Sequence, residues 1–126
     1  MARSYAARLA DIAENIDIVT QMTQGVDFTG YLADVQLRKA VERCIEIISE
    51  ASRSVPSEAK ARFPEIPWPD IAAIGNLLRH EYQRVDDFVI WSAATTSLAQ
   101  LRAVVVKLSD NLRLPEGFSS PGQKRL

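Results

Sequence analysis

Apolar residues recur at intervals of three and four along most of the chain, which is the spacing of a helix that buries one face. The pattern predicts helices over about residues 3–23, from residue 29 or 31 to about residue 54, and from residue 69 to about residue 82. A last long helix is predicted from residue 86 or 87 to about residue 112. There is no strand-like alternation and no internal repeat, so we predict an all-α, up-and-down bundle of four main helices plus a short helix.

Glycine and proline mark the ends of these helices. Gly25 ends the first helix and Pro56 stops the second, since proline cannot continue a helix. A short helix is predicted over residues 57–63, where a serine can cap and a glutamate falls in the first turn. Three prolines within residues 64–69 exclude regular helix there. We expect Trp68 to fill the core at this rigid connector.

The last predicted helix carries a heptad pattern of apolar residues, which requires a partner helix. Its positions are Trp91, Ala94, Leu98, Leu101, Val105, Leu108 and Leu112. The partner is either another helix of the same domain or a second copy of the chain. Residues 1–115 are predicted to form one helical domain, and residues 116–126 to form a disordered tail because they are rich in Gly, Ser and Pro.

Composition and charge describe an ordinary globular chain. Of 126 residues, 47% are hydrophobic, and 15 basic against 16 acidic residues give a net charge of −1, so any contact with RNA must be local. The lone Cys44 lies in an apolar stripe and is expected to be a reduced core residue rather than a nucleophile. No signal peptide is evident, and no window approaches the length of a membrane span. We therefore expect a cytoplasmic protein with no membrane partner.

The chain's one histidine, His80, lies in the predicted helix over residues 69–82. Histidine titrates near neutral pH and is the commonest proton-transfer group in catalysis. On a wheel of about 100° per residue, the apolar side chains of this helix share one arc. The remaining arc holds Gly75, Asn76, Arg79, His80 and Tyr82. This helix face is therefore the candidate site, and a solvated surface histidine is the alternative.

Gly75 lies in the middle of the candidate face. Glycine inside a helix costs about 0.5–1 kcal/mol relative to alanine, so it usually has a packing or access reason. Here we predict that it opens a notch. Helical side chains lean toward the N-terminus, so Arg79 is expected to fold back across this notch and hold an anion.

The sequence contains no motif that indicates a bound metal or cofactor. The carboxylates of Glu42, Glu46 and Glu50 recur along one helix, but no histidine accompanies them, and Arg38 and Arg43 can neutralise them. They are expected to form a solvated face. There is no glycine-rich phosphate loop, no Cys/His metal spacing and no Ser-His-Asp arrangement, so we predict no metal and no cofactor.

Three stretches resemble the HepT-like proteins of the HEPN superfamily, which are small and all-helical. The first is residues 40–51, the second is Pro67-Trp68 followed by Ile71, and the third is residues 74–82 with the acidic turn and Trp91 after them. The resemblance covers about residues 5–112. It implies a HEPN-like bundle that acts as a homodimer.

The family pattern R-N-x-x-x-H-x-Y is matched by Asn76, His80 and Tyr82, and Gly75 stands where the pattern has its arginine. In the family, arginine and histidine line a cleft between two protomers and cleave RNA without a metal. The resemblance implies that His80 is a general acid/base acting on a ribose 2′-hydroxyl and that Asn76 orients groups. Arg79 is our candidate for the cation that offsets charge on the phosphorane.

The resemblance also implies a partner. Members of the family are usually toxins of type VII toxin–antitoxin pairs, and an MntA-type nucleotidyltransferase antitoxin transfers AMP to the motif tyrosine, which is Tyr82 here. The added negative charge beside His80 would block RNA. A second hypothesis stays open because of Gly75: a non-catalytic helical module that binds nucleotide or serves as a scaffold for a nucleotidyltransferase.

Overall fold

A computed structural model describes residues 3–113 of the chain. In this range all regular elements are helical, which confirms the predicted all-α bundle. The elements are α1 (Tyr5–Thr23), α2 (Phe28–Ala33), α3 (Val35–Ser52), α4 (Ser57–Ala61), α5 (Trp68–His80), the 3-10 turn η1 (Tyr82–Arg84), α6 (Asp87–Ser92), the π-helical segment η2 (Ala93–Ser97) and α7 (Leu98–Arg113). The predicted tail over residues 116–126 lies outside the described residues.

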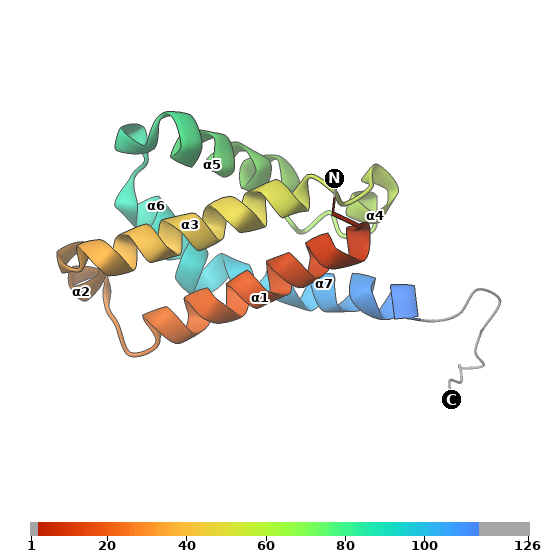
Figure 1. Cartoon of the computed structure of the whole chain (residues 1–126), viewed down its shortest axis with the longest axis horizontal. Coiled ribbons are helices and arrows are strands. Elements are labelled where there is room, and N and C mark those ends of the chain that lie inside the picture. The colour runs from red at the N-terminus through yellow and green to blue at the C-terminus, as the bar shows by residue number, and fades with distance from the viewer. Residues whose placement is uncertain (1–2, 114–126) are drawn as a thin grey trace.

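Four long helical segments build the bundle, namely α1, α3, α5 and the continuous run from α6 through η2 to α7. Figure 1 shows α3 between α1 and α5, and α7 packs against α1. The short helix α4 lies within the predicted residues 57–63. The layout therefore places α5 on the side of α3 that faces away from α1 (Figure 1).

The predicted second helix is split in two at Asp34. The backbone of Asp34 is extended, with φ −107° and ψ 96°, and its carboxylate accepts a hydrogen bond from the N–H of Leu37 at 3.0 Å. An aspartate in this position caps a new helix. The preceding short helix has its own cap, because Asp27 accepts a hydrogen bond from the N–H of Gly30 at 2.8 Å. The apolar periodicity continues through the break and hides it.

The core is formed by the inward faces of α1, α3 and the last helix. The most deeply buried side chains, at 0–1% exposure, include Leu9, Ile12, Ile16, Val19, Val41, Ile48, Leu101 and Val105. Trp68 is also buried, and its indole N–H donates to the carbonyl of Phe63 at 3.1 Å. This confirms that Trp68 fills the core at the proline-rich connector.

The heptad pattern of the last helix is covered within the monomer. Its positions from Ala94 to Leu108 are buried, and α1 packs on this helix, whereas Leu112 stays 49% exposed. Asp17 of α1 accepts two hydrogen bonds from the guanidinium of Arg102, at 2.6 and 3.0 Å. The partner helix is therefore α1, and this pattern does not by itself call for a second copy.

Helix α5 ends two residues earlier than predicted. Its last residue is His80, and the backbone of Glu81, with φ −143° and ψ 42°, leaves the helical conformation. Tyr82 begins the 3-10 turn η1. The prediction that Tyr82 shares the helix face with His80 was therefore wrong, because the helical wheel does not extend to it.

One helix of the described part, Asp87–Leu112, is long and apolar enough to cross a membrane by length and composition. The expectation that no window approaches this length was wrong. Core helices of soluble proteins meet the same criterion, and seven residues of this helix belong to the core, namely Ile90, Ala94, Leu98, Leu101, Val104, Val105 and Leu108. About a third of the apolar window, 33%, is buried in the bundle.

Candidate functional site

His80 and Asn76 lie one turn apart on the solvent side of α5. Both residues are exposed, and His80 is the last residue of the helix. Within residues 3–113 the imidazole makes no hydrogen bond and no ion pair. The ring is therefore accessible to a substrate from solvent, as a general acid/base requires.

Gly75 does not lie on this open face. It is buried, and its N–H donates to the Ser49 hydroxyl of α3 at 3.1 Å. A Cβ placed on Gly75 would lie 2.2 Å from Ser49 Oγ and 2.7 Å from Ser49 Cβ. The predicted notch was wrong, because the missing side chain is what lets α5 approach α3.

The same contact point carries two more hydrogen bonds between the helices. The carbonyl of Ala72 accepts from the Ser49 hydroxyl at 3.2 Å and from Arg53 Nη2 at 3.0 Å. Ser49 is 1% exposed, so its hydroxyl is fully used within the protein. Ser49 and Gly75 thus fix how closely, and in which register, α5 lies on α3.

Arg79 lies beside this contact, between α5 and the carboxylates of α3. Its Nη2 donates to Asn76 Oδ1 at 2.9 Å. Its Nη1 lies 3.5 Å from Glu50 Oε1 and 3.8 Å from Glu46 Oε2. Arg79 was predicted to fold back across a notch at Gly75 and hold an anion there; instead it contacts Asn76 and two carboxylates of α3. Its side chain remains 35% exposed.

Glu42, Glu46 and Glu50 of α3 differ in their surroundings. Glu46 and Glu50 pair with Arg79, whereas burial is the main cause that raises the pKa of Glu42 above its ordinary value. Arg43 pairs with Glu46 at 3.2 Å, as predicted, while Arg38 donates to the carbonyl of Leu32 and its positive charge offsets part of the rise in the pKa of Glu42. Among residues 3–113 no three His, Cys, Asp or Glu side chains gather where they could hold a metal ion.

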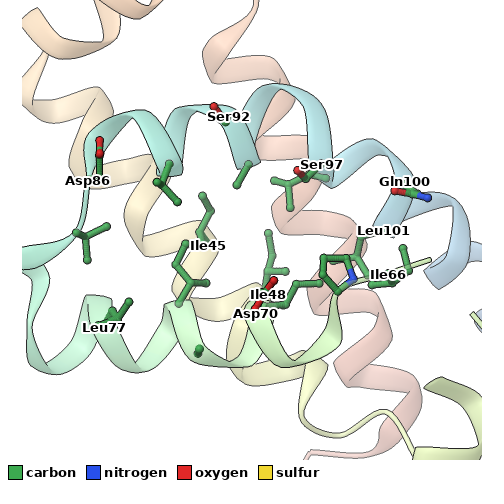
Figure 2. Close-up of a pocket in the computed structure, with 18 of the residues that line it drawn as sticks. Ile45, Ile48, Ile66, Asp70, Leu77, Asp86, Ser92, Ser97, Gln100 and Leu101 are labelled. Carbon is green, nitrogen blue, oxygen red and sulfur yellow. The ribbon is translucent and has the colours of Figure 1, made fainter. Parts of the chain in front are cut away.

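An apolar groove of about 930 Å³ runs between α5 and the run from α6 to α7, with Ile45 and Ile48 of α3 at its base. Figure 2 shows Leu77 of α5 on one side of it and Ser92 and Ser97 on the other. Three of its apolar residues stay largely exposed, Leu77 at 39%, Phe88 at 57% and Val89 at 51%.

The groove adjoins the candidate site. Leu77 and Ala73 line it, and His80 comes one turn after Leu77 on α5. Because residues three apart are neighbours on a helix surface, anything that covers Leu77 lies beside the imidazole. Sequence reasoning missed this groove because Leu77 fits the apolar arc of α5, and the arc was assigned to the core. The apolar pair Phe88-Val89 after the capping Asp86 was the available signal.

Comparison with known proteins identifies the class. Residues 12–108 match the family described as "Ribonuclease HepT-like". The chain is 37% identical over 108 residues to the "Probable ribonuclease HepT" of Thermococcus cleftensis, which covers 86% of this chain and 98% of that protein. It is 30% identical over 103 residues to the "Putative RNase MJ1380" of Methanocaldococcus jannaschii, covering 82% and 94%. No solved structure matches the chain.

The chain therefore belongs to the HepT-like ribonuclease family, as its sequence motifs predicted.

Proposed function

We propose that the protein is a metal-independent endoribonuclease. The observation that carries this proposal is the joint exposure of Asn76 and His80 on α5, with Asn76 hydrogen-bonded to the guanidinium of Arg79. A base, an amide and a cation on one surface can all reach the same phosphate. Membership of the HepT-like ribonuclease family supports RNA as the substrate.

The chemistry follows from these groups. His80 takes the proton of a ribose 2′-hydroxyl, the 2′-oxygen bonds to the adjacent phosphorus, and the bond from phosphorus to the 5′-oxygen breaks. The departing oxygen takes up a proton, and a 2′,3′-cyclic phosphate remains. Arg79 offsets the charge that builds on the phosphoryl oxygens, and Asn76 orients the guanidinium.

RNA cleavage in the presence of a chelator tests the proposal. His80→Ala should lower the rate by about 10²- to 10⁴-fold, the usual contribution of general acid/base catalysis. Glu14→Ala, which changes an exposed residue of α1, serves as the matched control. Equal rates for wild type and His80→Ala would refute the proposed role of the imidazole.

We further propose that the protein acts as a homodimer in the cytoplasm and that a second copy covers the apolar groove. The exposed Phe88 and Val89 supply an apolar surface, and the adjacent His80 would then face the second protomer. Val89→Glu should give a monomer in light scattering and lower RNA cleavage. Ile18→Glu is the matched control, because Ile18 is a 40% exposed apolar residue of α1, away from the groove. A dimer that survives Val89→Glu would place the interface elsewhere.

The proposed biological role is a toxin of a type VII toxin–antitoxin pair, held inactive when an MntA-type nucleotidyltransferase transfers AMP to Tyr82. Tyr82 begins η1 two residues after His80, so an added phosphate would repel RNA from the site. Co-expression with such an enzyme should add the mass of one AMP to wild type and none to Tyr82→Phe. An unmodified wild-type protein that is nonetheless blocked would refute this role for Tyr82.

A second function is favoured by the pairing of Arg79 with two carboxylates and by the buried Gly75. A non-catalytic partner of a nucleotidyltransferase needs no free cation at this face. It predicts that wild type binds the enzyme but cleaves no RNA in any assembly. Gly75→Arg is not a clean test, since its Cβ would overlap Ser49.

A further inference from the structure

Five charged side chains of alternating sign line the contact between α3 and α5. In order along α3 they are Arg43, Glu46, Arg79 of α5, Glu50 and Arg53. Arg79 occupies the centre of this row, and each neighbouring carboxylate lies between Arg79 and an outer arginine. The order follows from the antiparallel docking of the two helices at Ser49 and Gly75.

Each carboxylate that faces Arg79 has a second partner of its own. Glu46 lies 3.2 Å from Arg43 Nη1, and Glu50 lies 3.9 Å from Arg53 Nε. If Arg79 turns away, both carboxylates keep a cation beside them. The usual penalty for leaving a charge without a partner is therefore avoided.

The contacts of Arg79 differ in strength. Its hydrogen bond to Asn76 is 2.9 Å long, while its separations from Glu50 and Glu46 are 3.5 and 3.8 Å. The two longer contacts are ion pairs without hydrogen-bond geometry. Arg79 is thus held firmly on its own helix and loosely by α3, which leaves it able to exchange partners.

We propose that Glu46 and Glu50 form a carboxylate clamp. The clamp positions Arg79 and pairs with its positive charge until a phosphate of the substrate displaces the two carboxylates. The inference rests on the proposed function, because it assigns to Arg79 the cation used with RNA. Glu46 and Glu50 are positioning residues, since they act through Arg79. The clamp lowers the affinity of the free protein for phosphate and keeps the guanidinium beside Asn76.

The expected effect is modest, because exposed ion pairs shift an equilibrium by up to about fivefold. Glu50→Gln should tighten binding of a short 2′-O-methyl RNA, which cannot be cleaved, by about two- to fivefold at low salt. Glu46→Gln should act in the same direction and provides a second variant. Fluorescence anisotropy measures the affinity, and circular dichroism verifies that each variant is folded.

Two controls separate the clamp from a general change in charge. Glu42→Gln removes a carboxylate from the same helix, one turn before Glu46 and outside the clamp, so it should change the affinity less. In an Arg79→Ala background, Glu50→Gln should have no effect on binding. If Glu50→Gln tightens binding equally with and without Arg79, or if neither clamp variant tightens it, the clamp is refuted.

The outcome for the clamp can be distinguished from the outcome for the nuclease. A protein that cleaves no RNA but shows the Arg79-dependent gain in affinity would refute the nuclease and retain the clamp. A protein that cleaves RNA and shows no such gain in affinity would refute the clamp and retain the nuclease.

Discussion

The contact between Gly75 and Ser49 predicts that Gly75→Ala destabilises the protein. The same substitution at an ordinary helix glycine stabilises it. In an open helix, Gly→Ala stabilises by about 0.5–1 kcal/mol. Here the new Cβ would lie 2.7 Å from Ser49 Cβ, which no side-chain rotation can relieve. The helices must move apart, and overpacking of this kind costs about 1–3 kcal/mol.

The hydrogen bond from the N–H of Gly75 to Ser49 Oγ would be weakened as well, at a cost of about 0.5–1.5 kcal/mol. After the gain in helix propensity is subtracted, we expect Gly75→Ala to lower the free energy of unfolding by about 0.5–4 kcal/mol. Urea denaturation followed by far-UV circular dichroism measures this change.

Two further variants make the measurement specific. Ala73→Gly, at an exposed position of the same helix that lines the groove, gives the local cost of glycine away from the contact with Ser49. Ser49→Gly removes the atoms that the new Cβ meets, so Gly75→Ala should cost less in that background than in wild type. If Gly75→Ala instead stabilises the protein by the amount that Ala73→Gly destabilises it, the packing account of Gly75 is wrong.

Three other predictions concern buried and charged groups. Tyr31 is fully buried and its hydroxyl has no hydrogen-bond partner among the described residues, so Tyr31→Phe should raise the free energy of unfolding by about 1 kcal/mol, measured in urea; a loss of stability would contradict this. The hydrogen bond from Arg102 lowers the pKa of Asp17. This stabilisation is present above the ordinary pKa and is lost as pH falls through the lowered one. Asp17→Asn should therefore lower the urea midpoint at about pH 7 and not at about pH 2, and an equal loss at both would refute the assignment. Burial raises the pKa of the Cys44 thiol, so a thiol reagent should label Cys44 much more slowly in the native protein than in urea; equal rates would contradict its place in the core.

Local patterns predicted the helices well, because apolar periodicity, proline and capping residues act within a few positions of each other. Trp68 in the core and the start of the last helix at residue 86 or 87 were both predicted from such local signals; the structure has Asp86 as the cap, and its carboxylate accepts from the N–H of Phe88 at 2.8 Å. The break at Asp34 was missed because an aspartate cap leaves no gap in the apolar pattern.

The site was predicted only as far as one helix determines it. Asn76 and His80 lie on the exposed face, as the wheel indicated. The hydrogen-bond partner of Gly75 and the two carboxylates beside Arg79 come from α3, more than twenty residues away in sequence, so they depend on how the two helices dock. No spacing within α5 can reveal that Ser49 meets Gly75.

The close fit of Gly75 on Ser49 also limits how related sequences can vary. A larger side chain at position 75 needs either a glycine at position 49 or a wider separation of the two helices. An arginine at position 75, as in the family motif, would therefore be accompanied by a changed neighbour across the helix pair. Residues at positions 49 and 75 should therefore covary among related sequences. A relative that combines Ser49 with a bulky residue at position 75 must dock the helices equivalent to α3 and α5 in another register.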